Sequence, residues 1–314
     1  MGSAPLPSRR DRLAGGIYGL LVGDAVGVPY EFNRPEALPP LAALELDPPV
    51  DFRRSHAGVP PGTWSDDGAH ALCLLASLLE KDRLDVADLG RRLLAWYEEG
   101  YLAVGGKVFD VGIQTGKALR ALRAGTPASR SGPSDTQDNG NGSLMRVLPL
   151  ALWHRGSDAE LVSAAHDQSA VTHGHPRSQA CCALYCLWAR SILAGAADPW
   201  ADAVAAIRTI YRDLPAYSEE LESSLRPDDA PEGRGGGYVV DCLRSARLAL
   251  LAGSYEAVVK AAVALGNDTD TTACVAGGVA GVRDGVKAIP ERWRDRLRGA
   301  ELCDPLVEAL LERG

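Results

Sequence analysis

Apolar residues recur at intervals of three and four along most of this 314-residue chain. The stretches LLASLLEKDRLDVADLGRRLLAWYEE (74–99) and DCLRSARLALLAGSYEAVVKAAVALG (241–266) show the pattern clearly. Such spacing places the apolar side chains on one face of an α-helix, whereas the alternation typical of strands is nearly absent. The pattern predicts an all-α fold, a single compact bundle of many helices.

Three segments interrupt the helical pattern. They cover residues 33–62, which are rich in proline, 124–142 and 226–237, which are rich in glycine, proline and polar residues. No segment between them has the composition of an independent unit, so we interpret them as loops. We therefore expect a single domain over residues 1–314, with residues 1–10 flexible.

Two predicted helices carry glycines at four-residue spacing. One stripe contains Gly15, Gly19, Gly23 and Gly27, and the other contains Gly277, Gly281 and Gly285. Glycine destabilises a helix by roughly 1 kcal/mol, so a repeated stripe indicates that neighbouring backbones approach closely there. The stripes predict that these two helices lie near the centre of the bundle.

Charge and cysteine content exclude several classes of protein. The net charge of −8 argues against a broad basic surface for nucleic acid. The chain has no run of about 18 apolar residues and no secretory signal, so we expect a cytoplasmic protein without a membrane partner. The seven cysteines form no CxxC pair and are interpreted as small buried hydrophobes. The oligomeric state stays open, with a monomer favoured.

Two acidic clusters stand directly before apolar helical runs. Ser65, Asp66 and Asp67 open one run, and Asp268, Asp270 and Thr271 open the other. Acidic residues commonly stabilise a helix N-terminus through its dipole. Two such clusters side by side would repel unless a cation lay between them, and their six oxygen ligands suit Mg²⁺ or Mn²⁺. The spacing alone leaves helix capping and metal binding both open.

An ordered set of motifs resembles the ADP-ribosylglycohydrolase family, which includes the dinitrogenase-reductase-activating glycohydrolases. The motifs, spread over nearly the whole chain, are GLLVGDAVGVPYEF (19–32), GTWSDDGAHAL (62–72), FDVGIQTGKAL (109–119), NGSLMRVLPLAL (141–152), VTHGHPRSQACCALY (171–185), GGGYVVDCL (235–243) and GNDTDTTACVAGGVAGV (266–282). Each motif is weak alone, but the set in this order is specific.

The resemblance implies an all-α fold around a central binuclear site for two Mg²⁺ or Mn²⁺ ions. The family's metal ligands map onto six residues: Ser65, Asp66, Asp67, Asp268, Asp270 and Thr271. Glu31 matches the family's active-site glutamate, where it would position or deprotonate a water molecule. The catalytic residues are therefore expected to be Glu31, Asp67 and Asp268, with Asp24 either supporting the site or facing solvent.

The resemblance also implies a pocket for ADP-ribose. Asn141, Gly142 and Ser143 match a loop that binds the diphosphate, although their composition also suits a surface turn. His173 matches a position at the ADP-ribose pocket, and Tyr238 either borders the nucleotide or lies in the core. Arg146 is assigned a structural role, and His56, His70, His154 and His166 are assigned none. One departure from the family pattern is Gly68, which replaces a threonine in the first acidic cluster.

The function implied is metal-dependent hydrolysis of the glycosidic bond at the distal ribose of ADP-ribose, which removes mono-ADP-ribose from a modified protein side chain. Other substrates with the same metals are O-acetyl-ADP-ribose, another ADP-ribosyl small molecule and an ADP-ribosylated nucleic acid. A non-catalytic ADP-ribose binder and a two-metal phosphohydrolase are the further alternatives.

Overall fold

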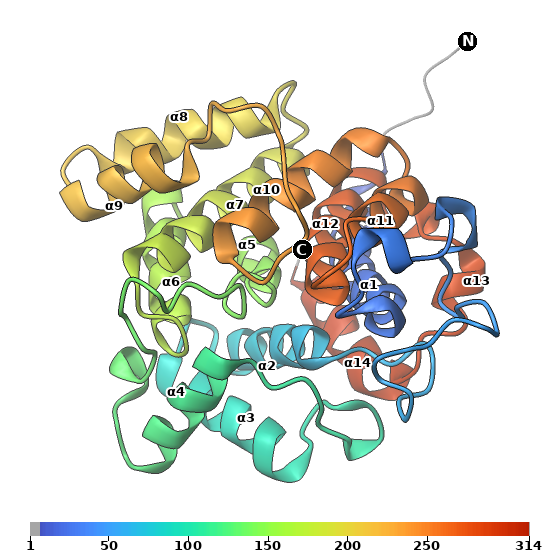
Figure 1. Cartoon of the computed structure of the whole chain (residues 1–314). Coiled ribbons are helices and arrows are strands. Elements are labelled where there is room, and N and C mark those ends of the chain that lie inside the picture. The colour runs from blue at the N-terminus through green and yellow to red at the C-terminus, as the bar shows by residue number, and fades with distance from the viewer. Residues whose placement is uncertain (1–6, 314) are drawn as a thin grey trace.

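The computed structural model describes residues 7–313, and this part of the chain is helical (Figure 1). The α-helices in it are α1 (Arg9–Gly27), α2 (Asp66–Lys81), α3 (Val86–Glu99), α4 (Ile113–Arg123), α5 (Leu148–Trp153), α6 (Asp158–Ala170), α7 (Pro176–Ala194), α8 (Pro199–Tyr211), α9 (Pro215–Glu219), α10 (Val239–Ala249), α11 (Tyr255–Val263), α12 (Thr269–Asp284), α13 (Glu291–Arg294) and α14 (Ala300–Glu312). The predicted all-α fold is confirmed.

Short helical turns link several of these helices. The 3₁₀ turns are η1 (Val28–Tyr30), η2 (Pro35–Ala37), η3 (Leu41–Ala43), η4 (Val104–Gly106), η5 (Ala128–Arg130), η7 (Leu250–Ala252) and η8 (Val286–Ala288), and η6 (Glu220–Leu225) is a π-helical turn. The three segments predicted as loops, 33–62, 124–142 and 226–237, hold no α-helix. Between residues 7 and 313, the strand-like pairing is limited to one isolated bridge, between Gly140 and Tyr238.

Helices α1 and α12 form the most extensive helix pair and lie side by side (Figure 1). The glycine stripes meet in this contact: a Cβ on Gly19 would lie 2.5 Å from the carbonyl oxygen of Gly277, and a Cβ on Gly277 would lie 2.5 Å from that of Gly19. Gly285 departs from the expected stripe, because it follows the last residue of α12 and ends the helix with φ 79°. The close backbone contact fixes where α12 begins relative to α1.

The segment Arg9–Tyr30, which contains α1, is long and apolar enough to cross a membrane, but 94% of its most apolar window is buried inside the protein. Arg12 ties this segment to its neighbours, because its guanidinium donates hydrogen bonds to the carbonyl oxygens of Ile192, Leu193 and Val282. Burial on all sides is the behaviour of a central core helix. Of the segment expected to be flexible, residues 1–6 lie outside the described residues, while Arg9 and Arg10 belong to α1.

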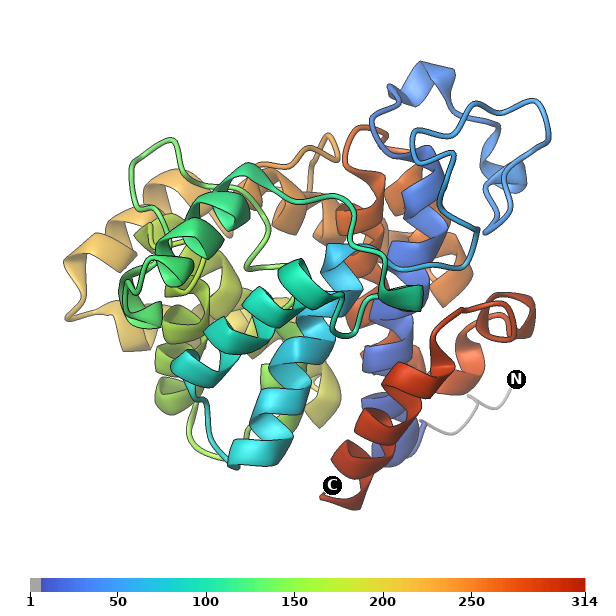
Figure 2. The same ribbon diagram turned by 90° about the horizontal axis from the view of Figure 1, so that it is seen from below.

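The long segment between η1 and α2 covers one end of α1, as seen from below in Figure 2. It returns to the core at Trp64, which is buried and donates a hydrogen bond to the carbonyl oxygen of Leu102. Helix α2 then starts at Asp66 beside the start of α12. The fold thereby brings the two acidic clusters, about 200 residues apart in the sequence, to one place.

Candidate active site

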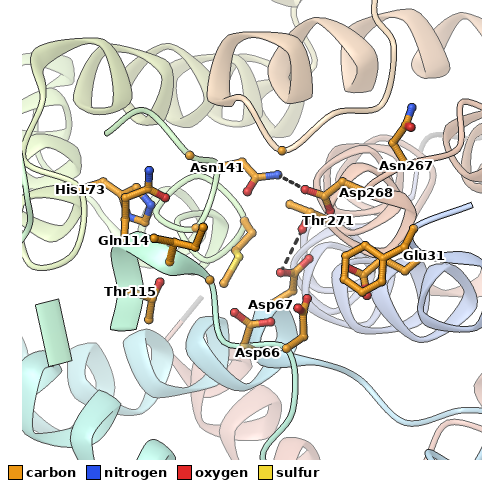
Figure 3. Close-up of a pocket in the computed structure, with 18 residues that line it drawn as sticks. Glu31, Asp66, Asp67, Gln114, Thr115, Asn141, His173, Asn267, Asp268 and Thr271 are labelled. Carbon is orange, nitrogen blue, oxygen red and sulfur yellow. Dashed lines mark hydrogen bonds between the residues drawn. The ribbon is translucent and has the colours of Figure 1, made fainter. Parts of the chain in front are cut away.

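A cavity of about 490 Å³ opens where the starts of α2 and α12 meet (Figure 3). Acidic residues lie on one side of it, and His173, Gln114 and Thr115 lie on the opposite side. Several parts of the chain line the cavity: the two residues after η1, the start of α2, residues 110–115, residues 140–145, His173, Gly237 and the start of α12. Residues distant in sequence thus share one pocket.

The start of α2 supplies part of the acidic floor. Ser65 is the N-cap, and its Oγ accepts a hydrogen bond from the backbone N–H of Asp67. Asp66 and Asp67 both line the cavity and are almost completely buried. Ser65 is not among the lining residues, so its hydroxyl serves the helix end in this structure.

Asp24 on α1 fixes the start of α2 by hydrogen bonds to its backbone. Its carboxylate accepts hydrogen bonds from the backbone N–H of Ser65, at 3.0 Å, and of Gly68, at 2.8 Å. The side chain is fully buried, so the solvent-facing alternative is wrong. Asp24 sits on α1, and α1 is fixed against α12, so one rigid unit positions both acidic clusters.

The start of α12 supplies the other half of the floor. Asp268 is the N-cap residue but makes no capping hydrogen bond with its side chain. Instead, its Oδ2 accepts a hydrogen bond of 2.9 Å from Asn141 Nδ2. Thr271 Oγ donates a hydrogen bond of 3.3 Å to Asp67 Oδ1 and so joins the two helix starts. Asp270 is fully buried behind them.

The acidic groups perturb one another strongly. Burial, reinforced by neighbouring carboxylates, raises the pKa of Asp66, Asp67 and Asp270 well above the ordinary value. Burial together with the negative charges of Asp110, Asp268 and Asp66 raises the pKa of Glu31 to about 11. Buried carboxylates with no positive side chain among them favour the protonated state unless a cation compensates their charge.

Glu31 follows η1 and lies at the edge of the acidic floor. It shares a tight cluster with Asp110 and Asp270, in which one carboxylate oxygen from each residue lies within 4.8 Å of the others. Its Oε2 is joined to His56 Nε2 by a hydrogen bond of 2.5 Å. Glu31 is therefore a buried carboxylate of the site and not a solvated turn residue.

Asn141, Gly142 and His173 line the neutral side of the cavity. A Cβ on Gly142 would lie 2.9 Å from His173 Cε1, so the small residue leaves room for the imidazole. The Nδ1 atom of His173 is paired with Thr172 Oγ at 2.8 Å. Burial and the charge of Arg146 lower the pKa of His173 to about 3, which keeps the ring neutral.

Two of the predicted substrate residues, Ser143 and Tyr238, do not line the cavity. Ser143 does not line the cavity, because it is fully buried and its hydroxyl pairs with Cys182 and Ser169. Tyr238 is 42% exposed, so the core alternative is wrong. The cavity lining includes its neighbour Gly237 but not Tyr238, whose hydroxyl accepts a hydrogen bond from Arg177.

Arg146 has the structural role assigned to it. It is fully buried and donates hydrogen bonds to the carbonyl oxygens of Gly142 and Gln168 and to Thr172 Oγ. These bonds tie the glycine-containing segment to α6. Arg146 thereby fixes the neutral side of the cavity from behind.

Comparisons with known proteins agree with this geometry. The family model described as ADP-ribosylglycohydrolase matches residues 5–314. The chain belongs to the ADP-ribosylglycohydrolase family. It is 30% identical to the ADP-ribosylarginine hydrolase Tri1 of Serratia proteamaculans, over 96% of this chain and 79% of that protein. It is 28% identical to the ADP-ribosyl-[dinitrogen reductase] glycohydrolase of Rhodospirillum rubrum, over 93% and 92% of the two chains.

The fold is shared with a solved member of the family. A chain of an ADP-ribosylglycohydrolase-related protein complex superposes with a TM-score of 0.74 at 32% identity, covering 97% of this chain and 98% of the other. The all-helical compact architecture is therefore that of an ADP-ribosylglycohydrolase.

The acidic cluster of this family member fits a metal ion. Asp67 Oδ2 and Asp270 Oδ2 are buried and have no hydrogen-bond partner among the described residues. A buried carboxylate oxygen without a donor is costly unless a cation satisfies it. The donors are oxygen atoms throughout, which suits a hard divalent cation. The buried cluster of Glu31, Asp110 and Asp270 provides further oxygen ligands nearby.

Sequence reasoning missed two residues at this site. Asp110 lies in the motif FDVGIQTGKAL but was not assigned a role, because it stands alone in irregular chain ahead of α4. Its backbone adopts φ 54°, which is uncommon for a non-glycine residue. His56 lies in the proline-rich segment 33–62, and nothing in its neighbours points to Glu31. For Asp110, the motif itself was the available signal.

Proposed function

We propose that this ADP-ribosylglycohydrolase cleaves the glycosidic bond at the distal ribose of ADP-ribose and releases mono-ADP-ribose from a modified protein side chain. The observation that carries the proposal is the meeting of two acidic helix starts, Glu31 and a glycine-containing segment in one cavity. Arginine is the first linkage to test, because relatives with 30% and 31% identity are named ADP-ribosylarginine hydrolases.

In the proposed metal centre, two Mg²⁺ or Mn²⁺ ions would be held by Ser65, Asp66, Asp67, Asp268, Asp270 and Thr271. Ser65 Oγ, which accepts the N–H of Asp67 in this structure, would then turn toward an ion. When bound, the ions would supply Lewis-acid charge that orients the ribose hydroxyls and polarises the attacking water, while the carboxylates of the floor would stabilise the developing oxocarbenium-like state. Asn141 restrains Asp268 through its hydrogen bond, and Thr271 restrains Asp67. These contacts keep the carboxylates in place before substrate arrives.

Glu31 is the proposed base. It takes a proton from a water molecule as the water oxygen bonds to C1″ of the ribose and the bond from C1″ to the acceptor breaks. The proton then passes to the leaving group, so the products are ADP-ribose and the unmodified side chain. Positive charge on the floor is required for this role, because it favours ionised Glu31 over the protonated form. Asp110, in the same cluster, is the second candidate base.

The neutral side of the cavity is the proposed binding region for the rest of the nucleotide. The segment 140–142 lines the cavity with two glycines beside Gln114 and His173, and it is the proposed contact for a phosphate group. Neutral His173 offers a ring nitrogen there without adding charge. The Ser143 side chain is not part of this proposed binding region, since its hydroxyl pairs with Cys182 and Ser169 in the core.

The test is release of free ADP-ribose from arginine-linked, serine-linked and acetyl-linked substrates, each with Mg²⁺, with Mn²⁺ and with a chelator. The proposal predicts metal-dependent release from the arginine-linked substrate. Release from the acetyl-linked substrate alone would replace the proposed acceptor. ADP-ribose binding without release from any substrate would favour a non-catalytic binder, and phosphate release would favour a phosphohydrolase. The cytoplasmic location and the single domain stay predictions from the sequence.

A further inference from the structure

His56 is an unassigned side chain in direct contact with the proposed base. Its Nε2 atom lies 2.5 Å from Glu31 Oε2, and the two side chains are only 16% and 3% exposed. A hydrogen bond between partly desolvated polar groups is stronger than one in water and restricts the orientation of both. The carboxyl group of Glu31 also pairs with that of Asp110 in the acidic cluster. His56 is therefore the non-acidic partner of the two side chains that orient the Glu31 carboxylate.

The imidazole of His56 also contacts the chain segments that carry Glu31 and Asp110, two carboxylates at the rim of the cavity. Its ring centroid lies 5.7 Å from that of Phe32, the residue after Glu31. It lies 5.1 Å from the ring centroid of Phe109, the residue before Asp110. Both distances are those of tilted aromatic contacts. His56 thus joins the segment of Glu31 to the segment of Asp110.

The main chain around Glu31 is restrained by the same segment. Ser55 Oγ donates a hydrogen bond of 2.6 Å to the carbonyl oxygen of Glu31. Phe32, directly after Glu31, has φ 60°, a conformation that a non-glycine residue adopts only when surrounding contacts hold it. Ser55 and His56 together hold the backbone and the carboxylate of the same residue.

We propose that His56 is a positioning residue that orients the carboxylate of Glu31 toward the reacting water. This inference rests on the proposed hydrolysis, which it deepens by naming the residue that sets the geometry of the base. His56 itself does not reach the cavity, because the cavity lining includes Glu31 and Phe32 but not His56. It therefore acts through Glu31 and takes no proton from substrate.

Two substitutions separate the hydrogen bond from the aromatic packing. H56Q keeps a side-chain amide that can donate or accept near the position of Nε2, but it removes the ring. H56F keeps a ring between Phe32 and Phe109, but it removes the hydrogen bond. The matched control is His154, which is also half-buried and pairs with Arg190 at 2.8 Å away from this cavity. H154Q and H154F report the general cost of changing such a histidine.

The kinetic expectation is a fall in kcat for H56F of roughly 10- to 100-fold, the usual effect of losing a partner that orients an active-site ligand. KM should stay close to the wild-type value, because His56 does not touch the cavity. H56Q should retain most of the rate, and the H154 variants should match the wild type. Full activity in H56F together with loss in H56Q would overturn the proposal and leave only a packing role.

A double-mutant cycle gives a second kinetic test. If His56 acts through Glu31, adding H56F to E31Q should lower kcat no further than E31Q alone, because the shared interaction is already lost. An H56F effect of equal size in both backgrounds would overturn the proposal.

A spectroscopic readout makes the inference independent of turnover. The imidazole ¹⁵N shifts of His56, measured through its non-exchanging ring protons and assigned by their loss in H56F, should change in E31Q but not in a distant control such as D158N. Unchanged ¹⁵N shifts in E31Q would overturn the proposed contact, whatever the substrate. If the wild type releases no ADP-ribose from any substrate, the proposed hydrolysis fails, and the ¹⁵N result alone then decides whether His56 orients Glu31.

Discussion

The floor and the rim of the cavity hold their carboxylates in different ways. On the floor, Asp66, Asp67, Asp268 and Asp270 lie at the starts of two helices whose positions are fixed by packing. On the rim, Glu31 and Asp110 lie in irregular chain, next to or at residues with positive φ: 60° at Phe32 and 54° at Asp110. Regular helices are rigid supports, whereas such backbone conformations persist only through local contacts.

The difference indicates that the floor and the rim have different roles. The floor requires several oxygen atoms in a fixed arrangement, which two helices locked by glycine contacts provide. The rim requires a carboxylate whose orientation and protonation can respond to what binds, and a few hydrogen bonds suffice to hold it. Changes on the floor should therefore affect metal binding and the stability that bound metal provides, whereas changes on the rim should affect turnover first.

The largest expected effect is on the floor. D67N replaces a carboxylate whose Oδ2 is buried and has no hydrogen-bond partner among the described residues. The proposed metal centre should therefore lose a ligand. Metal ions contribute several kcal/mol of transition-state stabilisation, so ADP-ribose release should fall by roughly 10³-fold. The matched control is D158N, an acidic residue in the first turn of α6 that does not line the cavity. Equal activity in D67N and wild type would contradict a role for the floor.

On the rim, E31Q should lower kcat by about 10²-fold, the usual contribution of a general base. The melting temperature should not fall, because the substitution removes a buried carboxylate of raised pKa and not a packing contact. Steady-state kinetics and Mn²⁺ titration of the same sample provide the measurement. Intact turnover with normal Mn²⁺ binding would show that Glu31 is not the base.

The glycine contact beneath the floor can be tested by stability. G281A places a methyl group against the carbonyl oxygen of Gly15, where no space exists. Overpacking of this kind destabilises by about 1–3 kcal/mol, which urea denaturation would measure. The control is G116A in α4, where the nearest atom to the added Cβ lies 3.5 Å away and a small gain in helix stability is expected. Equal stability of both variants would argue against tight α1–α12 packing.

The smallest expected effect is a pH dependence of the metal-free protein. Burial, with the charge of Asp268, raises the pKa of Asp110 to about 6 from its ordinary value of 3.8. Between these values the folded protein holds a proton that the unfolded chain releases, so this contribution to stability is lost as pH rises. The difference between the melting temperatures of D110N and wild type, measured in chelator, should therefore change in favour of D110N as the pH rises from 4 to 7. Parallel curves for the two proteins would contradict the raised pKa.

The sequence predicted the helical fold and the floor because both depend on local patterns. The apolar spacing and the acidic residues that open α2 and α12 are set by neighbouring residues, and the structure confirms both helix starts. The glycine stripes indicated a close contact because few other features explain repeated glycines in a helix. Each of these signals lies within a single helix.

The supporting contacts depend on tertiary structure and left little signal. Asp24 holds the start of α2 from 41 residues away, and His56 reaches Glu31 across 25 residues of loop. The sequence also did not indicate that the Ser143 side chain points into the core, since its hydrogen-bond partners Ser169 and Cys182 lie in α6 and α7. Hydrogen bonds of this kind follow from how the helices pack, which residue spacing does not encode.

The most direct test of the central claim is Mn²⁺ titration by calorimetry of wild type and D270N, with the melting temperature of each protein measured in chelator. If the buried acidic cluster is a metal centre, the wild type binds Mn²⁺ and is stabilised by it. D270N then loses this affinity, yet its metal-free form melts at or above the wild-type temperature because one buried acidic group is gone. Unchanged Mn²⁺ affinity with a lower melting temperature in D270N would show that the acidic helix starts serve only as caps.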